Sequence, residues 1–427
     1  METNSSLNKL QKKHKWFLLL MSSLMFSTLL LFISVTSTST STHLLNRRLR
    51  RNKKHFSLEV PLFVESKLPK PVFSVRTIPR LAYLISGSVG DGVSIRRTLK
   101  ALYHPRNQYA LHLDLEASAQ ERMELFRWVR EENLFNQVGN VRVIVRSNLV
   151  TYPGPTMVSN TLHAAAVLLR QGGEWDWFIN LSASDYPLLT QDDLLHTLST
   201  IPRDLNFIEH TSELGWKVYG RAKPIIIDPG LYSLQKSNVF WLSERRKLPA
   251  TFKLFTGSAW MMLSRPFVEY CIWGWDNLPR IVLMYYTNIL SSPEGYFHTV
   301  ICNAKEFKNT TVNHDLHFIA WDNPPTQHPH FLTVEDYELM IESNAPFARK
   351  FGRNDAVLDK IDSEILGRSP DGFVPGGWFS KEDTNKTIPE FLKTNNTDLK
   401  PGPGARRLKR LITSRLSAED FHSTHCI

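Results

Sequence analysis

Apolar and polar positions divide the chain into an N-terminal apolar run, a polar stretch and a long alternating region. Residues 16–35 contain no charged side chain and directly follow a run that includes Lys12, Lys13 and Lys15. A run of about 20 apolar residues matches the thickness of a bilayer core and exceeds the apolar region of most cleaved signal peptides. The pattern therefore predicts a transmembrane signal anchor. A cleaved signal peptide is the alternative, and it would deliver the chain to the same compartment.

The predicted anchor sets the expected order of the chain. Residues 1–15 form a cytosolic tail, residues 36–78 a stem, residues 79–375 a globular domain and residues 376–427 a C-terminal extension. Basic residues between 47 and 54 oppose this orientation under the positive-inside rule, but the lysines before the run lie closer to the membrane. The tail from about residue 380 to Pro403 is expected to be loosely ordered.

From Leu81 onward, apolar segments alternate with amphipathic ones. Strands are expected at residues 80–86, 109–114, 141–145 and 177–181, and helices at residues 93–103 and 158–170. This alternation predicts an α/β fold with a mostly parallel central sheet. Because ligands of such sheets bind beyond the carboxyl ends of the strands, Ser86, Gly87, Ser88, Asp114 and Asp185 should lie along one edge.

Basic side chains are concentrated before the globular domain. The 427 residues carry a net charge of +10. Residues 1–76 hold 13 Lys and Arg against 3 Asp and Glu, which accounts for all of the excess. Basic residues at this place suit anionic lipid headgroups and argue against a nucleic-acid partner.

Few cysteines are present, so a disulfide scaffold is excluded. Cys271, Cys302 and Cys426 allow at most one bridge, and Cys271–Cys302 is the expected pair.

Asparagine sequons provide a second indication of compartment. Asn309, Asn385 and Asn395 begin sequons in polar stretches, and glycosylation there would require a lumenal domain. Asn180 also fits the pattern, but it lies in an apolar strand where a glycan would not fit.

Metal-ligand patterns are weak. Sites in which a divalent metal bridges a pyrophosphate commonly use two acids after a central strand, and this sequence has only Asp185 there. Asp114 with Glu116 is the alternative pair, whereas Asp192 and Asp193 look like a helix start. If no metal binds, cationic side chains must balance the charge of a leaving group.

Two segments carry candidate chemistry with an equally simple structural explanation. The loop 87–92 contains three glycines and can be a phosphate cradle or a turn. Ser292, Pro293 and Glu294 predict a helix start with Ser292 as the N-cap. Spacing alone favours an electrostatic role for Glu294 at the helix dipole over a role as general base.

Several short segments together resemble the core-2/I-branching enzyme family (glycosyltransferase family 14), and specifically its plant branch of β-glucuronosyltransferases that act on arabinogalactan. These segments are 81–85, 112–114, 184–187, 255–260, 292–294 and 348–351. The resemblance covers residues 79–375. It implies a GT-A-like nucleotide-sugar transferase fold, a type II Golgi membrane topology with a lumenal catalytic domain, inversion at the anomeric carbon and no metal cofactor.

The resemblance also implies a reaction, the transfer of glucuronic acid from UDP-glucuronate to β-linked galactan of arabinogalactan proteins. Transfer of N-acetylglucosamine or xylose is the alternative within the family. A carbohydrate-binding membrane protein without catalysis and a metal-dependent transferase using Asp114 and Glu116 are the further alternatives.

The resemblance also implies site residues, because positions of this sequence match positions of the family's motifs. Glu294 matches the catalytic base, which reverses the preference from spacing, and Lys350 matches a cation that neutralises the UDP diphosphate. No arginine matches the second diphosphate cation, so His328 or His330 would replace it. The other UDP-site residues are Ser86, Gly87, Ser88, Asp114, Tyr152, Asp185 and Arg349. The acceptor positions are Glu209, Trp260 and Trp321. Arg221, Lys223 and Arg349 are the candidates for binding the donor carboxylate.

Overall fold

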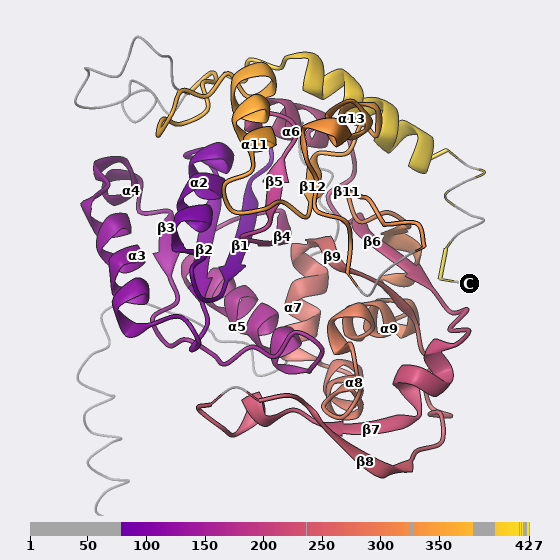
Figure 1. Cartoon of the computed structure of the whole chain (residues 1–427). Coiled ribbons are helices and arrows are strands. Elements are labelled where there is room, and N and C mark those ends of the chain that lie inside the picture. Colours follow the sequence, from indigo (N-terminus) through magenta and orange to yellow (C-terminus); the bar gives the residue numbers. More distant parts are fainter. Residues whose placement is uncertain are drawn as a thin grey trace, which may run out of the picture. The chain divides into compact units, whose positions relative to one another are not determined.

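A seven-stranded sheet with the order β10-β6-β9-β4-β1-β2-β3 forms the centre of the fold (Figure 1). Its strands are β1 Leu81–Gly87, β2 Gln108–Leu113, β3 Val141–Val143, β4 Trp177–Ser182, β6 Asn206–Thr211, β9 Thr256–Ser264 and β10 Thr311–Val312. Strands β1 to β4 pair in parallel, and β9 runs antiparallel to both β4 and β6. The prediction of a mixed α/β fold with a mostly parallel central sheet is confirmed.

This computed structural model describes residues 78–378 except 236 and 325–327, together with residues 398–417, 419, 421, 425 and 426. The predicted anchor, nearly all of the stem and the sequons at Asn385 and Asn395 lie outside the described residues. Among the helices that are described, none is long and apolar enough to span a bilayer.

Alternate residues of β1 face opposite sides of the sheet, as expected for a strand buried on both faces. Leu81, Tyr83 and Ile85 pack in one core with the helices on one side, and Ala82 and Leu84 pack in the core on the other. The first core includes α2 Gly92–Leu102, α3 Ala119–Glu131, α4 Asn133–Val138 and α6 Gln191–Leu198; the second includes α5 Thr156–Gln171, α7 Arg265–Trp273, α8 Leu278–Tyr286 and α9 Tyr296–Asn303. The sheet is therefore covered by helices on both faces.

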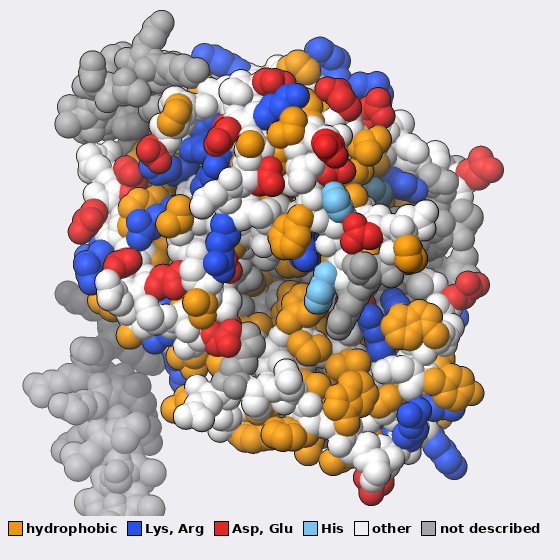
Figure 2. Space-filling model, in the orientation of Figure 1, with side chains coloured by type: hydrophobic (Ala, Val, Ile, Leu, Met, Phe, Trp, Pro, Cys, Tyr) orange, Lys and Arg blue, Asp and Glu red, His pale blue; other side chains and the backbone are white. Residues whose placement is uncertain are grey.

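Two smaller sheets flank the central one. Strands β5 Asp185–Pro187, β12 Phe347–Arg349 and β11 His317–Ile319 form one of them, beside α10 Tyr337–Glu342 and α11 Ala356–Lys360. The other is a hairpin of β7 Pro224–Ile227 and β8 Phe240–Arg245, which follows the short π-helix η2 Val218–Ala222. Every residue of β8 is exposed, and Figure 2 shows apolar side chains gathered over η2 and this hairpin.

The C-terminal helix α13 Pro403–Arg415 belongs to the same core. Its Leu408 and Ile412 are buried with the leucines of α6. Asp192 and Asp193, which lie in the first turn of α6 as predicted, accept hydrogen bonds from the backbone nitrogens of Lys400 (2.7 Å) and Gly402 (2.5 Å). The loose order expected up to Pro403 is therefore wrong for residues 398–402.

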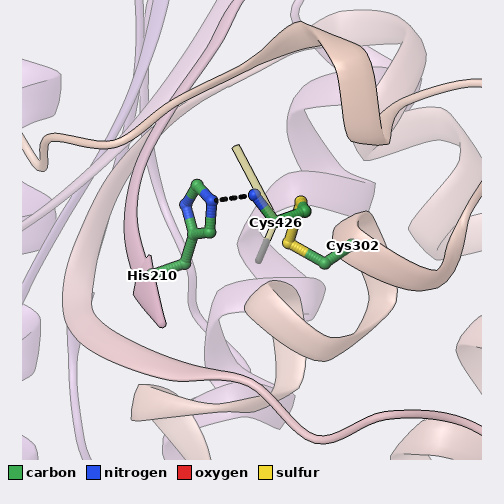
Figure 3. A group of neighbouring side chains, drawn as sticks. All are labelled: His210, Cys302 and Cys426. Atoms are coloured by element: carbon green, nitrogen blue, oxygen red, sulfur yellow. Dashed lines mark hydrogen bonds between the residues drawn. A yellow bond between two sulfur atoms is a disulfide. The ribbon is translucent and has the colours of Figure 1, made fainter. Parts of the chain in front are cut away.

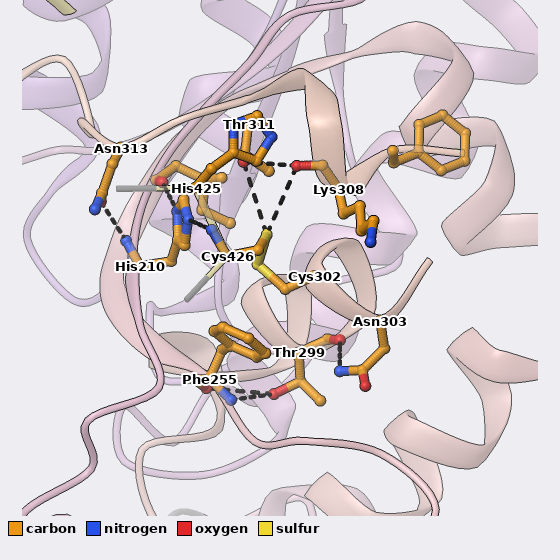
Figure 4. Close-up of a disulfide and its surroundings, with 12 residues drawn as sticks. His210, Phe255, Thr299, Cys302, Asn303, Lys308, Thr311, Asn313, His425 and Cys426 are labelled. Carbon is orange, nitrogen blue, oxygen red and sulfur yellow. Dashed lines mark hydrogen bonds between the residues drawn. A yellow bond between two sulfur atoms is a disulfide. The ribbon is translucent and has the colours of Figure 1, made fainter. Parts of the chain in front are cut away.

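The disulfide joins Cys302 to Cys426, so the expected Cys271–Cys302 pair is wrong. Cys271 is a buried free thiol of α7 that packs in the core. The backbone nitrogen of Cys426 also donates to Nε2 of His210 at 2.9 Å (Figure 3). The bridge thus fixes Cys426 to α9, and the hydrogen bond to His210 fixes it to β6 (Figure 4). Since its sulfurs are bonded to each other, this Cys-Cys-His group offers no thiolates to a metal.

Candidate active site

The ends of β1 and β2 meet as predicted. Ser88 donates its hydroxyl to Oδ1 of Asp114 at 3.0 Å and to Oε2 of Glu116 at 3.1 Å. The backbone nitrogen of Asp114 donates to the carbonyl oxygen of Gly87 at 3.1 Å, and the Asp114 residue is 2% exposed. The expected uridine-site residues of these two strands are therefore neighbours at one edge of the sheet.

The glycine loop after β1 is a turn held by acids. Glu121 accepts hydrogen bonds from the backbone nitrogens of Gly90 (3.1 Å) and Gly92 (3.0 Å), and Asp91 accepts one from Ser88 (2.9 Å). A phosphate would need these same donors. Of the two interpretations that the sequence left open, the structure favours the turn over the phosphate cradle.

Asp185 and Arg349 form a buried pair across β5 and β12. The Nε atom of Arg349 lies 3.5 Å from Oδ1 of Asp185, and its guanidinium carbon lies 3.9 Å from the ring centroid of Trp260. Asp185, Arg349 and Trp260 are 1%, 7% and 5% exposed. The arginine therefore links the acid after β4 to the tryptophan of β9.

Lys350 is the next residue along the chain, but it contacts a different ring and no acid in the described ranges. Its Nζ atom lies 4.0 Å from the ring centroid of Phe331, and it forms no ion pair within the described ranges. Loss of hydration and then the charge of Arg349 lower the pKa of Lys350. The charge of Asp322 also acts on Lys350, but no acid among the described residues forms an ion pair with it, so this cation is available to bind an anion.

Glu294 is the last residue of the short 3-10 helix η4 Ser292–Glu294. It does not lie in the first turn of a longer helix. The predicted N-cap at Ser292 is wrong, because its hydroxyl donates backward to the carbonyls of Tyr286 (2.8 Å) and Ile289 (2.6 Å). Helix α9 begins only after Gly295. A Cβ atom at Gly295 would lie 2.5 Å from the hydroxyl of Tyr286, so this close approach requires glycine.

The carboxylate of Glu294 is held by two cations from the segment before β7. Arg221 donates to Oε2, and Nζ of Lys217 lies 4.0 Å from the same oxygen. The other oxygen, Oε1, has no protein partner in the part of the chain that the structure describes. The Glu294 side chain is 25% exposed, so it is only partly covered by protein.

Tyr152 is near both Glu294 and the Asp185–Arg349 pair. The charges of Arg349, Glu294 and Asp185 all act on its phenol, whose pKa is raised mainly by loss of hydration. The carbonyl of Pro153 accepts a hydrogen bond of 2.7 Å from the backbone nitrogen of Ser291, which fixes the loop after β3 to the turn before Glu294. Of the predicted site residues, Tyr152, Glu294, Asp185 and Arg349 are therefore close enough for their charges to interact.

The predicted acceptor residues are dispersed around this site. Glu209, an exposed residue of β6, has its pKa raised by loss of hydration and then by the carboxylates of Asp315 and Glu294. Trp321 is 54% exposed, whereas Trp260 is buried under Arg349. Glu209 and Trp321 can be reached from solvent, and the ring of Trp260 is largely covered by protein.

His330 binds two acids. Its Nδ1 lies 2.9 Å from Oδ1 of Asp322, and its Nε2 lies 3.4 Å from Oδ2 of Asp336. The hydrogen bond to Asp322, with the charge of Asp336, raises the pKa of His330. Both ring nitrogens of His330 therefore already face acids in this structure, and its predicted contact with a diphosphate stays a prediction. The other candidate, His328, contacts the ring of Tyr152 at a centroid distance of 6.2 Å.

The family is decided by comparison with known proteins. Residues 81–341 match the model of the core-2/I-branching enzyme family. The chain belongs to this family.

Its relatives are glycosyltransferases. The chain is 60% identical to β-glucuronosyltransferase GlcAT14A of Arabidopsis thaliana over 417 residues, which cover 97% of this chain and 93% of that one. It is 55% identical to GlcAT14C of the same plant, over 82% and 86% of the two chains. Xylosyltransferase 1 of Rattus norvegicus is 29% identical over 73% of this chain and 38% of its own length. The predicted family and the predicted glycosyltransferase activity are confirmed.

Sequence reasoning missed part of the site. It gave Arg221 only as a candidate for the donor carboxylate and did not name Lys217, yet both contact Glu294. The only local signal for Lys217 and Arg221 was that these cations follow an aromatic residue, Trp216, between two strands.

Proposed function

We propose that this glycosyltransferase moves glucuronic acid from UDP-glucuronate to β-linked galactan of arabinogalactan proteins. The main support is its 55–60% identity to three β-glucuronosyltransferases over most of the chain. The observation that carries the mechanism is the Glu294 carboxylate, fixed through one oxygen and open at the other, beside the predicted donor site.

The proposed reaction is a single displacement. Oε1 of Glu294 accepts the proton of an acceptor galactose hydroxyl, and the hydroxyl oxygen bonds to the anomeric carbon of the donor. The bond from that carbon to the diphosphate breaks at the same time, and its electron pair leaves with UDP. Attack from the face opposite UDP inverts the anomeric carbon, and the proton remains on Glu294 until it passes to solvent.

Lys350 stabilises the leaving diphosphate in this proposal. Its ammonium has no acid partner within the described ranges, and charge stabilisation is strongest in a partly desolvated site. No metal cofactor is proposed. Of the candidates for the donor carboxylate, Arg221 and Arg349 already pair with acids, and Lys223 contacts the ring of Tyr219 at 4.3 Å.

The proposed location is the Golgi membrane, with a type II topology and the catalytic domain in the lumen. The apolar run at residues 16–35 would be the anchor. A disulfide between Cys302 and Cys426 suits an oxidising compartment, and the sequon residue Asn309 is exposed. Asn180 is 3% exposed, in agreement with the expectation that its sequon cannot carry a glycan. Protease protection of the domain in sealed Golgi vesicles tests the topology.

A donor panel tests the reaction. The purified domain is incubated with a β-galactan acceptor and UDP-glucuronate, UDP-N-acetylglucosamine or UDP-xylose, with and without EDTA. We expect transfer from UDP-glucuronate alone, and the same rate in EDTA. Transfer only from another donor would assign the alternative sugar, and activity that EDTA removes and Mn²⁺ restores would assign the metal-dependent reaction.

A further inference from the structure

Trp216 lies one side chain away from the catalytic carboxylate. The guanidinium carbon of Arg221, whose Nη1 donates to Glu294, lies 5.1 Å from the ring centroid of Trp216. Trp216 is nevertheless 67% exposed. An indole ring is therefore presented to solvent next to the group that activates the acceptor.

The ring of Trp216 is fixed in place despite its exposure. A Cβ atom at Gly220 would lie 3.0 Å from Cε3 and 3.1 Å from Cζ3 of the ring, so the indole packs directly on the backbone of Gly220. The carbonyl of Trp216 accepts hydrogen bonds from the backbone nitrogens of Tyr219 (3.2 Å) and Gly220 (3.0 Å). An aromatic ring that is already ordered loses little entropy when a ligand covers it.

A second exposed ring lies in the same turn. Tyr219 is 64% exposed, with Nζ of Lys223 4.3 Å from its ring centroid. Arg245 of β8 donates to the carbonyl of Tyr219 at 3.3 Å, which connects the turn to the exposed hairpin. Figure 2 shows that apolar side chains gather over this part of the surface. Contiguous exposed apolar surface of this kind commonly marks a binding site.

The chemistry of these rings points to a sugar chain. A β-linked galactose ring carries a patch of C–H groups on one face and hydroxyls at its edge, so it can stack on an aromatic ring while its hydroxyls stay in water. We propose that Trp216, with Tyr219 beside it, binds galactose units of the acceptor chain next to the unit that reacts at Glu294. This inference rests on the proposed function. It makes the enzyme selective for extended galactan over short acceptors.

Acceptor length tests the inference. The ratio of kcat/KM for a long β-galactan oligosaccharide to kcat/KM for galactobiose is measured with UDP-glucuronate. Trp216→Ala should lower this ratio roughly tenfold, which corresponds to about 1.4 kcal/mol. Trp216→Phe should retain most of the ratio, and Tyr219→Ala should lower it in the same direction. Trp273→Ala removes an exposed tryptophan from α7 and is the matched control, with an unchanged ratio expected.

The possible failures are distinguishable. Wild-type protein that transfers glucuronic acid to neither acceptor would overturn the proposed function. Wild-type transfer with the same ratio in Trp216→Ala and Tyr219→Ala would overturn only this inference. Trp216 also packs on Arg221, so its loss can lower the rate with both acceptors equally. Such a loss cancels in the ratio. If Trp216→Ala does not fold, Tyr219→Ala still decides the matter, because a lowered ratio is expected for it as well.

Discussion

Arg221 donates to Oε2 of Glu294 and leaves Oε1 without a protein partner among the described residues. The two side chains are 73 positions apart, one on the π-helix before β7 and the other on the turn before α9. A general base must be held in a fixed place and still accept a proton from its substrate. Oε2 holds Glu294 in place, and Oε1 is left to accept the proton, so the carboxylate can meet both requirements.

Arg221→Gln should therefore misplace the base. We expect kcat to fall by roughly 10- to 100-fold, because small losses of alignment are costly in rate, while KM for the UDP-sugar stays near its wild-type value. Steady-state kinetics with varied donor measure this difference. Arg246→Gln is the matched control, since Arg246, like Arg221, lies 5.1 Å from the centroid of an aromatic ring but donates to backbone carbonyls. An unchanged kcat in Arg221→Gln would remove the positioning role.

The neighbouring cations Arg349 and Lys350 should respond differently to substitution. Lys350→Gln should weaken UDP binding about tenfold in calorimetry and leave the melting temperature unchanged, because the lysine is bound to no acid in the described ranges. Arg349→Gln should instead lower the free energy of unfolding by about 3 kcal/mol, because it leaves the carboxylate of Asp185 buried and unpaired. Lys360→Gln is the control for Lys350, since its Nζ also lies over a ring, at 4.1 Å. Equal UDP affinity in Lys350→Gln and wild type would contradict the assignment.

Three buried histidines predict how stability depends on pH. Burial lowers the pKa of His104, His112 and His298 to about 3, whereas the unfolded chain takes up the same protons near pH 6.5. Between these values the unfolded state binds more protons than the native state, so stability falls as the pH falls. Well below pH 6.5 the slope from the three histidines should approach about 4 kcal/mol per pH unit, with little change above pH 7.

Urea unfolding between pH 8 and pH 5 measures this slope. His298→Gln should reduce the slope, and His196→Gln should not, because His196 is exposed on α6. Stability that stays level or rises from pH 7 to pH 5 would show that these three histidines take up protons in the folded protein.

Elements that depend on local pattern could be predicted from the sequence. The strand expected at residues 177–181 is β4 at 177–182, and the helix expected at residues 158–170 is α5 at 156–171. Apolar runs and amphipathic spacing determine such segments before any tertiary contact forms. The meeting of Ser88 with Asp114 at one edge also followed, since parallel strands bring their carboxyl ends together.

Features that depend on long-range packing could not be predicted. The partner of Cys302 is 124 residues away in the sequence, and nothing local distinguishes Cys426 from Cys271 as that partner. The Ser292 hydroxyl donates to the preceding turn because the chain enters η4 through a left-handed Ser291, with φ of 57°. Arg221 likewise reaches Glu294 only because η2 lies beside η4 in the folded protein.

Glu294→Gln tests the central claim most directly, by measuring the rate of glucuronic acid transfer to β-galactan beside the affinity for UDP. The change replaces the oxygen base with an amide of nearly the same shape. We predict a loss of about 10²- to 10⁴-fold in kcat with UDP affinity unchanged. Glu269→Gln, which alters a glutamate paired with Arg265 on α7, should keep full activity. Transfer by Glu294→Gln at the wild-type rate would contradict the account.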